Sequence, residues 1–247
     1  MEKEYKFLSK YYDALHQKKD YGAESLFFTK LINKHKKSEG TDLLDVACGT
    51  GSHLFYLKKN FFVMGIDLNK DVLEIAEKKN PGINFEVEDM LKLKTNKKYD
   101  AITLLFSSIA YLRNKEEIIK ALGNFQNSLK AGGVLLIETS FLKNSLKNGE
   151  YTRSYSGRSL SIARVMNFFI DKNVVEVKAK YIIKEKGEPV KEVKDKIKVP
   201  LFTKEVLVKI IKDVGFAVSV SSYKKSGTTI FACTKTIPPQ KASLKNI

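Results

Sequence analysis

Residues 45–51 read DVACGTG, which begins within the apolar run LLDVA (43–47) and leads into a helical stretch centred on residues 54–57. Gly49 and Gly51 allow a tight turn and let the backbone approach a ligand closely. Asp45 supplies an acidic side chain at the end of the strand that precedes the turn. This strand, turn and helix together predict a ligand site at the carboxyl end of the first strand of an α/β sheet.

The sequence around this unit is typical of a parallel sheet. Four more apolar runs follow, and they read FVMGID (62–67), INFEVED (83–89), DAITLLF (100–106) and GVLLIET (133–139). Amphipathic helical stretches lie between them and centre on residues 54–57, 72–79 and 118–129. Continuous apolar strands that alternate with helices predict an α/β fold, in which helices cover both faces of the sheet.

The flanking segments follow other patterns. Residues 5–36 carry apolar side chains at helical spacing, including Phe7 and Leu8, with a break at residues 20–22. Residues 158–199 alternate apolar and polar side chains around a turn at 186–189, which predicts an antiparallel meander of about three strands. Thr203 is expected to cap a last helix that ends at residues 214–215, and two final strands are expected around residues 217–223 and 229–234. We therefore expect a helical cap (1–40), a ligand-binding core (41–145 and 200–236), a β insert (146–199) and a flexible tail (237–247).

The charge is strongly basic, with 44 Lys and Arg against 28 Asp and Glu and a net charge of +16. The four arginines are Arg113, Arg153, Arg158 and Arg164, and every other basic residue is Lys. Arg is preferred where phosphates or bases are held by paired hydrogen bonds. Because the lysines are spread along the chain, they favour a general surface composition over a nucleic-acid face, and nucleic acid is a possible but not a favoured partner.

Composition also indicates the cellular compartment. The two cysteines, Cys48 and Cys233, suggest no disulfide framework. The N-terminal sequence MEKEYKFLSK has no apolar core of a signal peptide, and the chain has no run of 18 apolar residues. We expect a cytoplasmic protein with no membrane partner, and no metal, since His and Cys do not cluster.

Three acidic residues end successive strands and indicate the ligand. Asp67 follows Asp45 by 22 residues and can accept hydrogen bonds from two ribose hydroxyls, whereas Asp89, beside Met90, can bind an adenine amino group. A nicotinamide dinucleotide site needs a third Gly, where this chain has Leu54, and Asp45 would repel its pyrophosphate. The cationic, ribose-bearing S-adenosylmethionine fits these acids, and the alternative is a structural turn with incidental acids.

The chain resembles the class I S-adenosylmethionine-dependent methyltransferases through DVACGTG, GIDLN, EDM and AITLLFSSI, in this order within residues 5–236. The resemblance implies a Rossmann-like class I methyltransferase fold. Such a fold has a mostly parallel seven-stranded sheet with its last strand antiparallel, here joined by an antiparallel β insert and an N-terminal helical cap. It also implies S-adenosylmethionine as the cofactor.

A narrower resemblance links the chain to methyltransferases that dimethylate the amine of nucleotide-linked amino sugars. It rests on YYDAL, KDYGAE, LLDVACGTGSHL, LFSSIAYLRN and GRSLSIARV. It implies N-methylation of a small-molecule amine, an insert that forms a platform over the pocket, and a homodimer.

The same resemblance implies roles for individual residues. Tyr12 and Tyr21 would face the cofactor or the acceptor amine. A His that is thought to act as a base in the sugar enzymes aligns with Tyr111, and because Tyr has an ordinary pKa near 10 it is a poor base. Tyr111 and Tyr12 are therefore expected to orient the amine, the alternative for Tyr111 being a core-facing aromatic. The expected cofactor-binding residues are Tyr21, Asp45, Ala47, Cys48, Gly49, Gly51, Asp67, Leu68, Asp89, Met90, Leu105, Phe106 and Ser107.

The residues expected to bind the methyl acceptor differ from those of the resembled enzymes. Residues 226–229 read SGTT and lack an Arg that would hold a nucleotide diphosphate. Arg153, Arg158 and Arg164 are the remaining candidates for substrate binding. His53 is expected to pack at the start of its helix.

Other functions stay open at this stage. Neither cysteine follows the fourth strand, which argues against methylation of pyrimidine C5, and the strand ends LFSS rather than in the Pro-Pro motif of adenine N6 enzymes. An RNA (tRNA) or protein methyltransferase that uses the Lys-rich surface is the main alternative. A non-catalytic cofactor-binding partner protein is a third.

Overall fold

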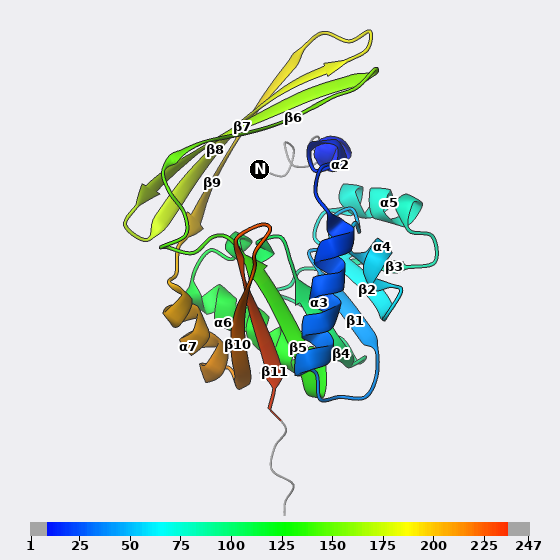
Figure 1. The fold of residues 1–247 in the computed structure, drawn as a ribbon, viewed down its shortest axis with the longest axis vertical. Helices are drawn as coiled ribbons and strands as arrows, with labels where there is room; N and C mark the ends of the chain where they lie inside the picture. The colour runs from blue at the N-terminus through cyan, green and yellow to red at the C-terminus, as the bar shows by residue number, and fades with distance from the viewer. Residues whose placement is uncertain (1–8, 237–247) are drawn as a thin grey trace, which may run out of the picture.

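The computed structural model describes residues 9–236. In chain order its elements are η1 (Ser9–Tyr11), α2 (Tyr12–Leu15), α3 (Tyr21–His35), β1 (Asp42–Val46), α4 (Leu54–Leu57), β2 (Phe62–Asp67), α5 (Lys70–Lys79), β3 (Asn84–Val87), β4 (Tyr99–Leu104), η2 (Ser108–Tyr111), α6 (Lys115–Ser128), β5 (Leu129–Thr139), β6 (Gly149–Ser156), β7 (Leu160–Asp171), β8 (Val174–Glu185), β9 (Lys191–Pro200), α7 (Lys204–Asp213), β10 (Phe216–Tyr223) and β11 (Thr228–Lys235). Figure 1 shows their arrangement.

The larger sheet has seven strands in the order β10-β11-β5-β4-β1-β2-β3. Neighbouring strands are parallel except that β11 runs antiparallel to both β10 and β5. The predicted α/β class, with a mostly parallel sheet and an antiparallel last strand, is confirmed. The strand order reverses between β1 and β4, and ligands of open α/β sheets bind at the carboxyl ends of strands at such a point.

Alternating side chains along the strands build one hydrophobic core on each face of this sheet. On one face Leu43 packs with Phe28 and Ile32 of α3 and with apolar residues of α4. On the other face Leu44 packs with apolar residues of α6 and α7, including Phe125. Burial on both faces explains why these strands read as continuous apolar runs.

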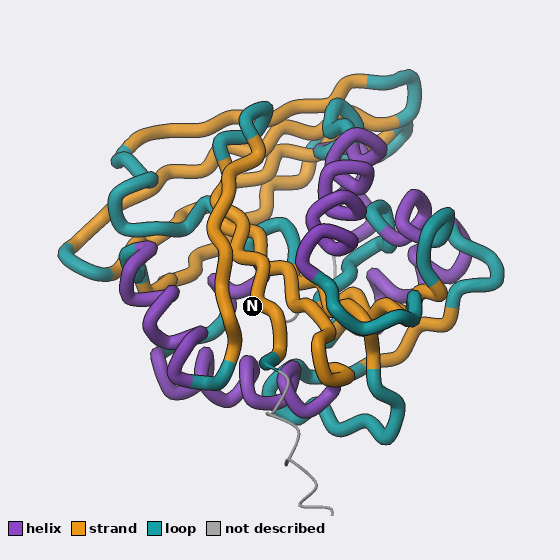
Figure 2. Tube along the Cα trace, turned by 60° about the horizontal axis from the view of Figure 1, so that its bottom comes forward, coloured by secondary structure: helices purple, strands orange, loops and turns teal. Residues whose placement is uncertain are grey.

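The insert is a four-stranded antiparallel sheet in the order β6-β7-β8-β9. The sequence predicts about three strands here, and the structure has a fourth, β6, which the sequence pattern does not indicate. Its residues are almost all exposed and polar, so this edge strand lacks the apolar alternation that marks the other three. The turn at residues 186–189 lies between β8 and β9, as predicted. Figures 1 and 2 show the insert lying across the molecule beyond the carboxyl ends of the core strands.

The N-terminal helices differ from the expected break at residues 20–22. The first helix ends at Leu15, and the second starts at Tyr21, because the side chain of Asp20 caps it by accepting a hydrogen bond from the Ala23 N–H at 2.9 Å. Tyr21 and the following Gly therefore belong to the second helix. Phe7 and Leu8, and the expected tail at 237–247, lie outside the described residues.

The last helix and the final strands lie where they were expected. Thr203 caps α7, and its Oγ1 accepts a hydrogen bond from the Val206 N–H at 3.3 Å. Within residues 9–236, no helix combines the length and the hydrophobicity that crossing a membrane requires.

Two hydrophobic clusters hold the insert in place. At one end, Tyr11 and Leu15 of the N-terminal segment pack against Ile162 and Ile183 of the insert. At the other end, Phe168 and other apolar residues of the insert pack with side chains from the loops that lead into it and out of η2. The helix α2 consequently lies between the insert and the core, as Figure 1 shows. The insert face that packs against α2 therefore lies above the core's strand ends.

Candidate active site

Asp67 joins the end of β2 to the glycine loop that follows β1. Its Oδ2 accepts a hydrogen bond from the Gly49 N–H at 2.9 Å, and its Oδ1 accepts one from the Asn69 N–H at 2.9 Å. Burial raises the pKa of this carboxyl, and the two N–H donors oppose that rise. The carboxylate is thus held in a fixed orientation, and it can accept further hydrogen bonds on its other lone pairs.

Asp45, at the end of β1, is buried with 2% of its surface exposed. The Thr103 hydroxyl donates a hydrogen bond of 2.6 Å to its Oδ1. Burial raises the pKa of Asp45 to about 6, against the opposing effect of this hydrogen bond and of His53. A buried acid of this kind gains from a nearby cation, because an opposite charge favours its ionised form. The buried carboxyl of Asp45 therefore fits a cationic ligand such as S-adenosylmethionine.

The glycine loop has a backbone that only small residues tolerate easily. Gly49 and Gly51 have φ angles of +56° and +69°, in the left-handed region. A Cβ on Gly51 would lie 2.8 Å from Asn80 Nδ2, whereas a Cβ on Gly49 would meet nothing within 4 Å. The loop is therefore packed against α5 at Gly51 and open at Gly49. Burial raises the pKa of the Cys48 thiol well above its ordinary value, so this thiol is no nucleophile at neutral pH.

The end of β4 is held in an unusual backbone conformation. Of four non-glycine residues with positive φ among residues 9–236, three follow β1 or β4, and they are Ala47, Phe106 and Ser107. The Phe106 N–H donates a hydrogen bond of 2.8 Å to Glu138 Oε2. Glu138 is 1% exposed and lies within the apolar strand β5. Such strained positions cluster at functional sites, where surrounding contacts hold them in place.

The predicted adenine end lies beside β3. Asp89 is half-buried, and its Oδ1 accepts a hydrogen bond from the Leu91 N–H at 2.8 Å. The carbonyl of Met90 accepts one from Asn124 Nδ2 at 2.9 Å. Leu68 is 69% exposed, and Leu105 is buried in the core. Because β1, β2 and β3 are parallel neighbours, the three strand-end acids share one edge of the sheet.

Two polar networks fasten the N-terminal cap to this edge, and the sequence patterns did not reveal them. Asp13 on α2 accepts hydrogen bonds from Thr50 Oγ1 and from Lys79 Nζ, each at 2.6 Å. Glu24 on α3 accepts from Lys19 Nζ at 2.5 Å and lies 3.0 Å from His53 Nε2. The only local signal for either set was the motif KDYGAE, which contains Lys19 and Glu24.

His53 has a structural environment. It is buried at the start of α4, and its ring makes an edge contact of 4.9 Å with the ring of Tyr21. The expected packing role at the helix start fits this environment, and the contact with Glu24 adds a polar partner.

Aromatic side chains gather where α2 meets the end of β4. The ring of Tyr12 lies 4.3 Å from the ring of His16 and 6.3 Å from that of Phe106. Burial raises the pKa of the Tyr12 phenol well above its ordinary value, and the proximity of Tyr21 and Tyr111 adds to the rise. Tyr111 is 56% exposed, so the alternative of a core-facing aromatic is wrong. The fold thus brings the three predicted tyrosines into one region.

Two of the three candidate arginines meet on the insert. Arg153 on β6 stands directly opposite Arg164 on β7, and Tyr181 on β8 is opposite Arg164 in turn. These residues share the face that carries Ile162, which packs against α2. Arg158 lies apart, in the exposed turn between the two strands. Like charges directly opposite each other destabilise a sheet, so this pair suits an anion placed between them.

Arg164 also has an unsatisfied donor. Its Nε is buried and has no hydrogen-bond partner within residues 9–236. Burial, followed by the charge of Arg164, lowers the pKa of Arg153. Both arginines act electrostatically on His16, which contacts Phe106 at a ring distance of 5.2 Å. His16 therefore lies close to both the arginine pair and Phe106.

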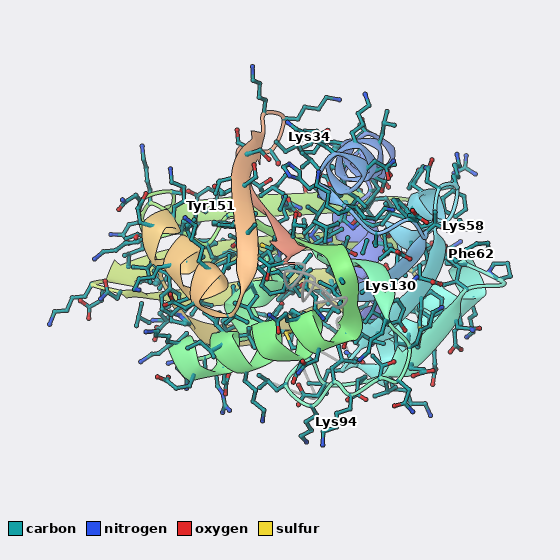
Figure 3. The ribbon with its side chains drawn as sticks, turned by 90° about the horizontal axis from the view of Figure 1, so that it is seen from below. Lys34, Lys58, Phe62, Lys94, Lys130 and Tyr151 are labelled. Atoms are coloured by element: carbon teal, nitrogen blue, oxygen red, sulfur yellow. The ribbon has the colours of Figure 1, made fainter. Side chains whose placement is uncertain are left out.

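Elsewhere the basic charge is dispersed. Figure 3 shows Lys34, Lys58 and Lys94 on different elements around the periphery. In the part of the chain that the structure describes, no group of three or more His, Cys, Asp or Glu residues is placed to hold a metal ion.

Comparison with known proteins places this architecture among enzymes. Residues 43–133 match the family model described as a methyltransferase domain. The dTDP-3-amino-3,4,6-trideoxy-alpha-D-glucopyranose N,N-dimethyltransferase of Streptomyces venezuelae is 30% identical over 186 residues, which cover 74% of this chain and 78% of the relative. The dTDP-3-amino-3,6-dideoxy-alpha-D-glucopyranose N,N-dimethyltransferase of Streptomyces fradiae is 27% identical over 228 residues, covering 91% and 89%. The crystal structure of Streptomyces venezuelae DesVI superposes with a TM-score of 0.82 at 27% identity, covering 90% of this chain and 94% of that one.

Proposed function

The chain belongs to the class I S-adenosylmethionine-dependent methyltransferases, and we propose that its acceptor is the amine of a sugar carried on a nucleotide diphosphate. The two relatives named above are N,N-dimethyltransferases of dTDP-linked amino sugars, and the match to both extends over most of each chain. Two successive methyl transfers to one nitrogen are part of the proposal.

The observation that carries the acceptor class is the arginine pair on the insert. Arg153 and Arg164 face each other across β6 and β7, and Arg164 Nε has no partner within residues 9–236. A guanidinium offers paired donors that match phosphate oxygens, and a diphosphate would relieve the repulsion between the two cations. The pair can take the place of the Arg that the stretch SGTT at residues 226–229 lacks.

The chemistry needs little help from acids or bases. S-adenosylmethionine, when bound, supplies a methyl group on a sulfonium, and the acceptor nitrogen's lone pair forms the new N–C bond as the C–S bond breaks to leave a neutral thioether. The methylated nitrogen then carries the positive charge, and it releases one proton to water before the second transfer. The residues of the chain contribute by holding the two reactants in line, which can account for a large share of the acceleration.

Each part of the site has a place in this arrangement. Asp67 would hold the ribose hydroxyls and Asp89 the adenine amino group. Asp45 would stabilise the cationic end through its buried carboxyl. The insert presents the arginine pair above the strand ends. Tyr12, whose phenol is kept neutral by burial, and Tyr111 would lie beside the acceptor amine as hydrogen-bonding partners.

The proposal is tested by steady-state kinetics with dTDP-3-amino-3,6-dideoxyglucose, with the same amino sugar lacking the nucleotide, and with bulk tRNA. We expect methylation of the sugar nucleotide alone, with mass gains of one and then two methyl groups. Methylation of tRNA alone, or of the free sugar as efficiently as the nucleotide, would contradict the proposal.

Matched arginine variants then test the diphosphate site. Arg153→Gln and Arg164→Gln should each raise KM for the sugar nucleotide about 10- to 100-fold, since a hydrogen bond to a charged group contributes about 1.5–3 kcal/mol. Arg158→Gln, in the exposed turn, is the control and should leave KM unchanged. An equal effect of all three substitutions would show that general charge, rather than the pair, attracts the acceptor.

A further inference from the structure

His16 has an unused hydrogen-bonding atom at the junction of the cap, the insert and the core. The residue follows α2 and is 2% exposed. Its Nδ1 lies 2.8 Å from the carbonyl oxygen of Tyr12, whereas its buried Nε2 has no partner within residues 9–236. Because a carbonyl oxygen can only accept, Nδ1 carries the proton in this contact. The neutral ring therefore presents a lone pair at Nε2.

The ring itself is fixed in position. It lies 4.3 Å from the ring of Tyr12, tilted by 36°, and makes an edge contact with Phe106 at 5.2 Å and 87°. Phe106 is in turn anchored through its N–H to Glu138. The imidazole is thus packed against Phe106, in the segment after β4 that is expected to bind the cofactor.

The surroundings keep His16 neutral. Burial lowers its pKa to about 4, and the positive charges of Arg164, Arg153 and Lys19 add to this effect, against the hydrogen bond to the Tyr12 carbonyl. The phenol of Tyr12 lies beside the ring, and it is itself acted on by the phenols of Tyr21 and Tyr111, by the carboxyl of Asp13 on the same helix, and by Arg164. His16 is consequently an uncharged acceptor across the physiological range, and it cannot be a general base of ordinary strength.

A neutral acceptor suits the proposed reaction. The nucleophile is an amine with a free lone pair, and an ammonium has none. The acceptor must therefore bind as the neutral amine, after its ammonium form has released a proton to water. An N–H of the neutral amine can then donate to His16 Nε2, which leaves the nitrogen lone pair free to point toward the cofactor.

We propose that Nε2 of His16 accepts a hydrogen bond from the acceptor amine and so orients its lone pair. This inference rests on the proposed function, and it adds His16 to Tyr12 and Tyr111 as a hydrogen-bonding partner of the acceptor amine. In this role His16 provides a hydrogen-bonding contact to the amine and does not take up its proton.

Two variants and a matched control test the role. His16→Phe keeps an aromatic ring without an acceptor, and it should lower kcat for dTDP-3-amino-3,6-dideoxyglucose about 10- to 100-fold while S-adenosylmethionine affinity and thermal unfolding stay near wild type. His16→Gln, which keeps an acceptor, should recover part of the loss. His35→Gln, a substitution in the last turn of α3, should have no effect.

A second readout needs no turnover. Nitrogen-15 NMR of the imidazoles in the cofactor-free protein should show His16 protonated at Nδ1 and free of titration down to about pH 5. Its Nε2 signal should shift when the sugar nucleotide is added. An Nε2-protonated ring, or an inflection of wild-type kcat near pH 6.5 that His16→Gln abolishes, would overturn the proposal.

The outcomes separate the two claims. If wild type methylates the sugar nucleotide and His16→Phe does so equally well, the role of His16 is refuted and the proposed function stands. If wild type methylates no amino sugar nucleotide, the proposed function is itself refuted, and the inference drawn from it is refuted as well.

Discussion

Replacement of Asp45 by Asn should stabilise the cofactor-free protein and weaken cofactor binding at the same time. Asp45 is 2% exposed, and Thr103 is the hydroxyl donor to its Oδ1. An Asn oxygen can accept the same hydrogen bond, so the substitution removes the charge and keeps the contact. The stability of the wild-type protein is reduced by this charge whenever the carboxyl is ionised in the fold.

The size of the effect follows from proton linkage. Burial raises the pKa of Asp45 from 3.8 to about 6, so the folded state holds a proton that the unfolded chain releases between these values. Stability therefore falls as the pH rises through this window and stays lower above it, by roughly 3 kcal/mol. Asp45→Asn lacks this loss, so its advantage over wild type should be about 3 kcal/mol at pH 8 and only about 1 kcal/mol at pH 4.5.

Urea unfolding of both proteins without cofactor, at pH 4.5 and pH 8, measures the difference directly. Asp213→Asn, at the exposed end of α7, is the control and should show no such pH-dependent gain. Calorimetry should also show that S-adenosylmethionine affinity falls below pH 6 in wild type and is weak at every pH in Asp45→Asn. An Asp45→Asn protein less stable than wild type at pH 8, with unchanged cofactor affinity, would refute the reasoning.

The remaining predictions concern the loop, the ribose contact and Tyr111. Asp67→Ala should weaken S-adenosylmethionine binding about 10- to 100-fold, because charge-assisted hydrogen bonds are lost, and unchanged affinity by calorimetry would contradict the assignment. Gly49→Ala and Gly51→Ala should each reduce the free energy of unfolding in urea by about 1–2 kcal/mol, because both positions have a positive φ. Gly51→Ala should cost more, because only its Cβ would meet Asn80, at 2.8 Å, and equal losses would argue against this packing. Tyr111→Phe should lower kcat about 2- to 10-fold if the phenol orients the amine, with no change in thermal unfolding because Tyr111 is 56% exposed, and wild-type turnover would exclude that role.

The sheet and the glycine loop could be predicted because their signals are local. Each core strand is an apolar run, and the acids Asp45, Asp67 and Asp89 follow such runs directly. Parallel pairing then places them on one edge without further information. The strand β6 gave no such signal, because its polar residues are exposed at the edge of the insert.

Contacts between distant segments could not be predicted in this way. Asp13 meets Lys79 across 66 residues, and Glu24 meets His53 across 29, so no spacing rule connects them. The pairing of Arg153 with Arg164 depends on the register of a hairpin, although their nearness in sequence did identify both as candidates. The packing of His16 against Phe106 could not be predicted either, because Phe106 lies in the loop after β4, 90 residues further along the chain.

The most direct test of the central claim is mass spectrometry of dTDP-3-amino-3,6-dideoxyglucose after incubation with the purified protein and S-adenosylmethionine. The account predicts product ions heavier by one and then two methyl groups, with both on the amine nitrogen. An unmodified sugar nucleotide, in the presence of a protein that binds S-adenosylmethionine and methylates tRNA or another macromolecule, would contradict it.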